Sequence, residues 1–462
     1  MAIDRQGNRF EGGAAAAEAL DGMLTCYALY RGDPVGALDR GLAQQPDCAL
    51  LWLAKAWLYA LATEPGAAAL ARGFVDRAEG LDCGAREAAH GAALRRLLSG
   101  DWSEAGRILE RWQAEAPRDL LALQSGHLID FFTANARSLR DRVARVLPDW
   151  HGVPGESWVL GMAAFGCEEA GDYARAEALG RKAVAEDPRD SWAHHAVAHV
   201  MEMQGRPEDG LGWMAAREAH WAAEDDNLQV HNWWHRALCH LELGDTAGAL
   251  RLYDGPVRRG GTGLALALAD ASALLWRIEM QGGDPGTRWE ELSDKWQAHL
   301  APGYYAFNDL HAAMAHLGAG RPERLRPLLA AAEGAGEAAG WMRRWGLPLI
   351  EGFQAFRAGD HARAADRLLA ARHIADGFGG SHAQRDVIDW TLTEAAIRGQ
   401  MPGLARALAQ ERAALRPHSA VNRGFLARAL ALAEPAAGRA PRADAGADQR
   451  RLHRHPQDIG AR

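Results

Sequence analysis

Apolar residues recur with a helical period along almost the whole chain, and short turns that contain glycine separate the apolar patches. Seven of these turns are YRGDPVGAL, LSGDWSEAG, EAGDYARAE, MQGRPEDGL, ELGDTAGAL, GAGRPERLR and RAGDHARAA. With Gly66 and Gly282 added, their first glycines are Gly32, Gly66, Gly100, Gly171, Gly205, Gly244, Gly282, Gly320 and Gly359. Successive glycines lie 34, 34, 71, 34, 39, 38, 38 and 39 residues apart. A spacing of 34 that stretches to 38 or 39, with one doubled gap, predicts stacked helix-turn-helix units.

The clearest unit runs from Ser157 to Pro188 and follows the tetratricopeptide pattern of large, small and turn residues. Trp158 begins its first helix, Gly171 opens the turn, and Ala176 lies on the tightly packed face of the second helix. Pro188 follows where the second helix must end, because proline cannot donate a backbone hydrogen bond. Small residues at such places let two helices approach closely.

Composition supports the same interpretation, because Ala and Leu dominate and the β-branched residues that pack well in sheets are scarce. One helix pair cannot bury its own apolar face, so neighbouring pairs must stack. We predict an all-α chain of tetratricopeptide-type repeats that form a right-handed superhelix, an α-solenoid. The predicted divisions are an N-terminal extension at 1–16, the repeats at 17–433 and a disordered tail at 434–462, which is poor in large apolar residues.

Charge and cysteine content exclude several classes of protein. A formal net charge of -8 with spread basic residues argues against nucleic acid as a partner. The five cysteines are never in CxxC spacing, so neither a disulfide framework nor a zinc ribbon is predicted. Without a signal region or a long apolar run, the chain is expected to be soluble and cytoplasmic, with no membrane partner. Phosphate-binding loops, a GxSxG elbow and kinase motifs are also absent from the sequence.

Histidines stand out on the helices that should face the concave side of the superhelix. Counting back from Gly205, the inward stripe contains Trp192, His195, His199 and Glu202. Counting back from Gly244, it contains His231, Trp234 and Leu238, with His235 beside them. Two consecutive repeats therefore carry HxxxH pairs that can converge.

This histidine pattern leaves more than one function open. A pair of histidines at i and i+4 can bind a divalent metal, with Glu202 or Asp270 completing the site. The same imidazoles could act as general acid and base, although the HExxH arrangement of helical metalloproteases is absent. Alternatively, the histidines join neighbouring helices by hydrogen bonds or line a polar groove for a peptide.

Two further segments are unusually polar for core positions. The first is Phe307–His311, in which Asn308 or Asp309 can cap a helix and His311 follows. The second is Gly379–Asp386, where Ser381 reads as an N-cap. It leaves three side chains on the first turn of the helix, His382, Arg385 and Asp386, of which the last two can pair with each other.

The chain resembles the tetratricopeptide repeat protein 38 family from about residue 20 to 430. The resemblance rests on HHAVAHVMEMQGRPEDGLGWM, HNWWHRALCHLELGD, DASALLWRIEM, FNDLHAAMAHLG and GGSHAQRD, which contain the histidine stripe, Asp270 and both polar segments. It implies a repeat superhelix and a shared site, but no established activity.

The leading hypothesis from the sequence is a cytoplasmic scaffold whose groove binds a peptide, a protein segment or a small polar ligand. The lining residues would be His195, His199, His231, Trp234, Asp309 and His382. The rival hypothesis is a metal-dependent or acid/base enzyme that uses the same histidines on a small metabolite; apart from such a divalent metal, no cofactor is predicted. A third alternative is a homo-oligomer formed through uncapped apolar ends of the repeat stack.

Overall fold

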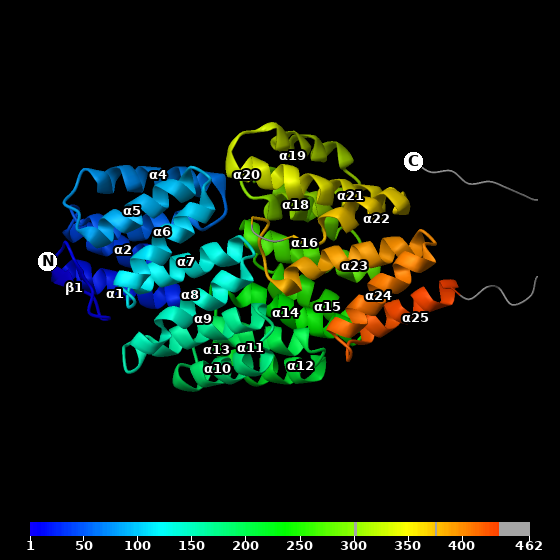
Figure 1. Cartoon of the computed structure of the whole chain (residues 1–462), viewed down its shortest axis with the longest axis horizontal. Coiled ribbons are helices and arrows are strands. Elements are labelled where there is room, and N and C mark those ends of the chain that lie inside the picture. The colour runs from blue at the N-terminus through cyan, green and yellow to red at the C-terminus, as the bar shows by residue number, and fades with distance from the viewer. Residues whose placement is uncertain (300–302, 375–376, 434–462) are drawn as a thin grey trace, which may run out of the picture.

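The computed structural model describes residues 1–299, 303–374 and 377–433 and consists almost wholly of helices (Figure 1). The predicted tail at 434–462 lies outside these residues. The only strands among them are β1 (Ala2–Ile3) and β2 (Arg9–Phe10), which pair antiparallel. Helices that follow each other in the chain pack against each other, as α9 does on α10 and α3 on α4. The predicted all-α class of paired helices is confirmed.

The helices of the first half are α1 (Ala14–Leu29), α2 (Pro34–Gln44), α3 (Ala49–Ala60), α4 (Pro65–Glu79), α5 (Ala85–Leu98), α6 (Trp102–Glu115), α7 (Leu120–Phe132), α8 (Ala136–Val146), α9 (Glu156–Glu169), α10 (Tyr173–Glu186), α11 (Ser191–Met203), α12 (Pro207–Ala216) and α13 (Glu218–Trp221). Those of the second half are α14 (Gln229–Glu242), α15 (Thr246–Leu252), α16 (Ala265–Met280), α17 (Arg288–Ala298), α18 (Ala306–Gly318), α19 (Arg326–Ala330), α20 (Gly336–Trp341), α21 (Leu347–Arg357), α22 (His361–Ala371), α23 (His382–Arg398), α24 (Pro402–Leu415) and α25 (Ala420–Ala433). Short 3-10 or π segments are η1 (Leu147–Trp150), η2 (Tyr253–Val257), η3 (Pro322–Leu325), η4 (Ala331–Glu333) and η5 (Met342–Gly346). No helix of the described residues is long and apolar enough to cross a membrane.

A Gly-Asp pair explains many of the turns. Gly171 has φ 82°, in the left-handed region that ends a helix without a side-chain clash. The next residue, Asp172, accepts the backbone N–H of Arg175 and caps α10. The same pair, with the same cap, occurs at Gly32, Gly100, Gly244 and Gly359.

The prediction of Gly66 as a turn glycine is wrong, and the doubled gap between Gly100 and Gly171 contains a turn without glycine. Gly66 lies inside α4, which starts at Pro65, and the left-handed residue of that turn is Thr63 with φ 59°. In the doubled gap, Ala134 takes the left-handed conformation with φ 57° between α7 and α8. A repeat is therefore present where no turn glycine marks it.

The C-terminal part of the chain packs back onto helices of earlier repeats. Helix α23 packs against both α11 and α16, and Figure 1 shows it beside α16. Arg277 on α16 donates to the carbonyl of Ala383 at 2.7 Å, and the backbone N–H of His382 donates to Glu169 at 2.8 Å. This closure buries most of the residues that the sequence predicts for a groove.

The first residues of the chain are part of the packed structure. Phe10 is buried, and the Asp4 carboxylate lies 2.8 Å from a guanidinium nitrogen of Arg86 on α5. Helix α1 already begins at Ala14. The segment predicted as an extension at 1–16 thus comprises a hairpin and the start of the first helix.

Candidate functional site

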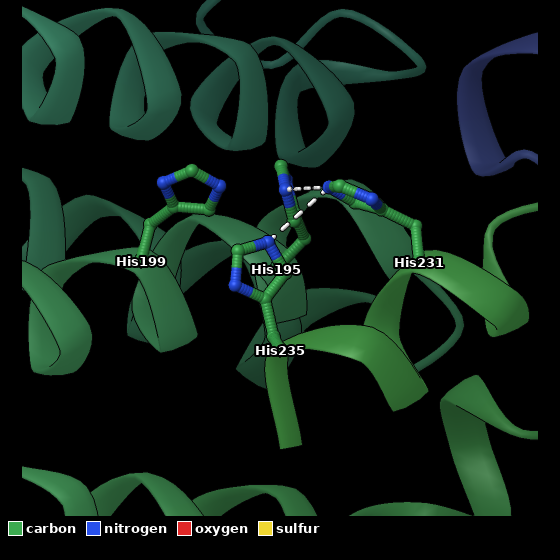
Figure 2. A group of neighbouring side chains, drawn as sticks. All are labelled: His195, His199, His231 and His235. Carbon is green, nitrogen blue, oxygen red and sulfur yellow. Dashed lines mark hydrogen bonds between the residues drawn. The ribbon is translucent and has the colours of Figure 1, made fainter. Parts of the chain in front are cut away.

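Four histidine side chains meet between two neighbouring repeats. His195 and His199 lie one turn apart on α11, and His231 and His235 lie one turn apart on α14 (Figure 2). Asp190 caps the start of α11 by accepting the backbone N–H of Ala193 at 2.9 Å. Because α11 packs on α14, the two HxxxH pairs face each other. The predicted convergence of the four imidazoles is therefore present.

The four rings are close enough to share one ion. His231 Nε2 lies 3.0 Å from His195 Nε2 and 3.2 Å from His235 Nε2. One nitrogen from each ring can be chosen so that all four lie within 4.8 Å of one another. In a tetrahedral zinc site with Zn–N bonds of about 2.05 Å, neighbouring nitrogens are about 3.3 Å apart. The two short N–N distances are thus near the edge length of such a tetrahedron.

Carboxylates lie behind three of the four rings. His231 Nδ1 is 2.7 Å from Asp270 Oδ2, and His235 Nδ1 is 2.9 Å from Glu202 Oε2. A carboxylate at Nδ1 favours the proton on that nitrogen and leaves the Nε2 lone pair directed away from it. The Nε2 atoms of His231 and His235 face each other at 3.2 Å, and both are free of a proton when the two rings are neutral with the proton on Nδ1.

The third carboxylate belongs to a residue that the sequence analysis missed. His199 Nδ1 is 3.4 Å from Glu168 Oε2, on α9 of the preceding repeat. Glu168 and Glu202 both stand three residues before a turn glycine, Gly171 and Gly205. This repeated position is a signal that could have identified Glu168 from the sequence.

Burial favours the neutral form of three of the rings, those of His195, His199 and His235. The exposed fractions of His195, His199 and His235 are 1%, 0% and 1%. Desolvation, followed by the charges of neighbouring histidines, holds the pKa values of His195 and His235 well below the ordinary value. For His199, desolvation outweighs the attraction of Glu202 and Glu169 and lowers the pKa to about 4. Neutral imidazole is the form that binds a metal.

Several polar atoms of this cluster have no hydrogen-bond partner among the described residues. They are His195 Nδ1 and both ring nitrogens of His199, which are completely buried. Buried polar groups are nearly always hydrogen-bonded, and each exception needs an explanation. A metal ion bound by the Nε2 atoms would satisfy one of these three atoms, His199 Nε2. Imidazole nitrogens suit zinc, copper, nickel and iron.

Trp234 supports the cluster rather than lining an open groove. Its exposed fraction is 0%, and its ring stacks on His231 with 5.3 Å between centroids and 14° between planes. The guanidinium of Arg277 lies over the same tryptophan at 5.6 Å. Gln384 on α23 donates to Asp270 at 3.2 Å, so α23 reaches the carboxylate behind His231.

The other polar residues of α23 pair differently from the prediction. Ser381 caps this helix, as predicted, and forms a reciprocal capping box with Gln384. Arg385 lies 3.3 Å from Glu169, whereas Asp386 binds Arg412 at 2.8 Å. The predicted Arg385–Asp386 pair is wrong because each side chain meets an oppositely charged partner on another helix.

His382 is the most exposed of the predicted site residues described here. Its side chain is 39% exposed, and its Nδ1 lies 3.7 Å from Glu169 Oε2.

Asp309 and His311 are buried on α18, and their role differs from the predicted one. This helix starts at Ala306, so neither Asn308 nor Asp309 is its N-cap. Asn308 donates instead to the carbonyl of Thr63, and Asp309 accepts the backbone N–H of Gly303 at 2.9 Å. Burial raises the pKa of Asp309 to about 7. His311 Nδ1 lies 2.7 Å from the carbonyl of Phe307, one turn earlier, so both residues have structural partners.

Fold and site together define a helical-repeat protein of the tetratricopeptide type with a buried histidine-carboxylate cluster. No protein-family model matches the chain. A segment of 89 residues, 19% of this chain, is 32% identical to cellulose synthase operon protein C of Komagataeibacter sucrofermentans. That segment spans only 7% of the bacterial protein.

Solved structures resemble the chain at low identity. One match is to a chain in the crystal structure of the APC/C hetero-tetramer Cut9–Hcn1, with 13% sequence identity and a TM-score of 0.38. The match covers 86% of this chain and 74% of the matched chain. Another match is to a monomeric IFIT1 mutant with Gppp-AAAA, with 14% sequence identity and a TM-score of 0.41. This match covers 90% of this chain and 99% of the IFIT1 chain. Similarity at this level assigns no ligand to the chain.

Proposed function

We propose that this repeat protein binds one divalent transition-metal ion through His195, His199, His231 and His235. The observation that carries the proposal is the convergence of four imidazoles, three of them buried and that of His231 half-buried, whose Nε2 atoms include contacts of 3.0 and 3.2 Å. Carboxylates behind the rings complete the pattern, because metal-bound histidines usually give their second N–H to a carboxylate or carbonyl. The ligands come from α11 and α14, so the ion would join two neighbouring repeats.

Burial supports this function over recognition of a peptide in a groove. A peptide needs accessible side chains, but His195, His199, Trp234 and His235 are at most 1% exposed. The resemblance to the tetratricopeptide repeat protein 38 family fits the proposal in that its motifs contain the same histidines. We propose that the chain belongs to this family.

The number of ligands supports a binding role over hydrolysis at this centre. Catalytic zinc sites usually have three protein ligands and keep a fourth position for water or substrate, whereas structural sites are closed by four. Four imidazoles would fill a tetrahedral shell. We therefore propose that the ion stabilises the junction of the two repeats.

Metal analysis of the purified chain tests the proposal. Protein made without an affinity tag is dialysed against Zn²⁺, Ni²⁺ or Cu²⁺, separated from free ions and analysed for bound metal. We expect about one equivalent per chain, and almost none in the double variant His195→Ala, His231→Ala. The control is His151→Ala, His220→Ala, which removes two exposed histidines and should keep the metal. Failure of the parent chain to bind any of the three ions would refute the proposal, as would full retention in the first double variant.

The carboxylate behind His231 gives a second prediction. In Asp270→Asn the amide can offer an N–H to His231 Nδ1, which favours the tautomer whose proton lies on Nε2, the nitrogen directed at the metal. We expect the metal affinity to fall by about 10- to 100-fold, measured by competition with a chromogenic chelator. The matched control is Asp245→Asn. Asp245 lies 2.9 Å from His240, a histidine of α14 like His231 but outside the cluster. Equal affinities for the two variants would contradict the predicted role of Asp270.

A further inference from the structure

Beside the four-histidine cluster lies a second group of possible metal ligands, formed by Glu168, Glu169 and His199. One ligand atom from each residue can be chosen so that all three lie within 4.8 Å of one another. Two of them, Glu168 and Glu169, end helix α9, and His199 comes from α11, so neighbouring repeats again contribute. All three side chains are buried.

The carboxylate of Glu168 has no adequate partner. Its exposed fraction is 0%, and neither of its oxygens has a hydrogen-bond partner among the described residues. Glu169 differs, because it accepts the backbone N–H of His382 at 2.8 Å and lies 3.3 Å from Arg385. A buried carboxylate without a hydrogen bond is costly, and burial followed by the charge of Glu169 raises the pKa of Glu168 well above its ordinary value. Glu168 is therefore an acceptor without a hydrogen bond that is directed at His199, beside a second carboxylate that disfavours its charged form.

His199 faces both groups of ligands at once. Figure 2 shows one of its ring nitrogens turned toward the other three imidazoles and the other nitrogen turned away from them. Because Nδ1 lies 3.4 Å from Glu168 Oε2, the nitrogen that faces the cluster is Nε2. Each nitrogen of this ring is buried without a hydrogen-bond partner.

We infer that Glu168, Glu169 and His199 bind a second divalent cation next to the four-histidine centre. This inference rests on the proposed function, because His199 would then bridge two ions. Two carboxylates and one imidazole favour a harder ion than four imidazoles do, so Mn²⁺ or Fe²⁺ suits the second site. Binding through both nitrogens removes the remaining proton of the His199 ring, and that proton passes to solvent.

The second site differs from the first in the number of its protein ligands and in its distance from the surface. Three protein ligands leave coordination positions for water or a small anionic substrate. His382 contacts Glu169 and is 39% exposed, so the surface lies one side chain away from the carboxylates. The four-histidine centre would hold its ion in a closed shell, whereas the second ion would keep exchangeable positions.

Titration of Mn²⁺ into zinc-loaded protein tests the inference. The full chain receives one equivalent of Zn²⁺, and Mn²⁺ is then added while the EPR signal of free Mn²⁺ is followed. We expect about one Mn²⁺ per chain in the parent protein and at least about tenfold weaker binding in Glu168→Gln, which removes one ligand and keeps the size of the side chain. Glu115→Gln, at an exposed position of α6, should behave like the parent. His199→Ala should lose Mn²⁺ and also hold Zn²⁺ more weakly.

Zinc is measured in the same samples, so the two proposals fail separately. Absence of Mn²⁺ binding to the zinc-loaded parent, or equal binding by Glu168→Gln, overturns the second site and leaves the four-histidine centre intact. Unchanged Mn²⁺ binding in His199→Ala overturns the bridge. Failure of the parent chain to retain zinc, together with its failure to bind Ni²⁺ or Cu²⁺, would overturn the proposed function itself. The melting temperature of metal-free Glu168→Gln provides the folding control, and we expect it to equal or exceed that of the parent.

Discussion

Unfolding free energy is expected to rise with the concentration of free Zn²⁺, by about 1.4 kcal/mol for each tenfold increase above the dissociation constant. At a thousandfold excess over that constant, the metal-loaded chain should be about 4 kcal/mol more stable than the chelator-treated chain. The reason is mass action, because only the folded chain brings residues 195, 199, 231 and 235 together.

Denaturant unfolding at a series of buffered Zn²⁺ concentrations measures this dependence. The double variant His195→Ala, His231→Ala should give superimposed curves at every concentration, since it lacks two of the four ligands. The variant with the two exposed histidines replaced, His151→Ala and His220→Ala, should follow the parent. Zinc-independent unfolding of the parent would contradict a metal centre that joins two repeats.

The repeat pattern carried the prediction of helices and of the histidine cluster, because both depend on local spacing. A helix places residues i and i+4 on one face, and a repeat places the next helix beside it, so two HxxxH pairs 36 residues apart, on the first helices of consecutive repeats, are expected to be neighbours. Turns without glycine could not be located from the spacing of glycines. Ala134 and Gln400 take left-handed φ values of 57° and 55°, which few residues other than glycine adopt.

Closure of the superhelix could not be predicted from spacing. The hydrogen bond from Gln384 to Asp270 joins residues 114 positions apart, and the bond from His382 to Glu169 joins residues 213 apart. Periodicity specifies which helices are neighbours along the stack, but it contains no information on such distant contacts. For this reason the burial of most of the predicted site residues, and the contacts of α23 with α11 and α16, could not be predicted from the sequence.

The packing of neighbouring repeats also explains how a repeat scaffold can bring several histidine and carboxylate side chains together. Successive first helices of three repeats, α9, α11 and α14, contribute Glu168, then His195, His199 and Glu202, then His231 and His235. No single helix pair offers more than three of these six groups. Stacking brings side chains of neighbouring repeats close together, and α23 packs against two of the helices concerned, α11 and α16. The site is thus a consequence of repetition followed by closure.

A second large effect is expected at the other end of the molecule, at an ionic network that anchors the N-terminal hairpin. Arg86 on α5 is 3% exposed and lies 2.9 Å from Asp119 and 2.8 Å from Asp4. Asp119 also lies 3.1 Å from His90 and accepts the indole N–H of Trp112 at 2.8 Å. Burial alone would raise the pKa of Asp119, but the charges of Arg86 and His90 outweigh it and hold this pKa well below its ordinary value.

Arg86→Met is expected to lower the unfolding free energy by about 3–5 kcal/mol at pH 7, because it leaves the buried Asp4 and Asp119 without their cation. The loss should shrink as the pH falls toward 4. In the parent, the low pKa of Asp119 gives a stabilisation that is complete above the unfolded value near 3.9 and is lost only as the pH falls from there toward the lower folded value. In the variant, a protonated Asp119 no longer carries an unpaired charge, so the variant recovers part of its loss at lower pH. Arg95→Met is the control, since Arg95 pairs with Glu79 at the surface with both side chains about half exposed, and it should cost at most about 1 kcal/mol. Urea unfolding of both variants at pH 7 and pH 4 makes the comparison; a pH-independent loss, or equal losses for the two variants, would show that the network contributes through packing alone.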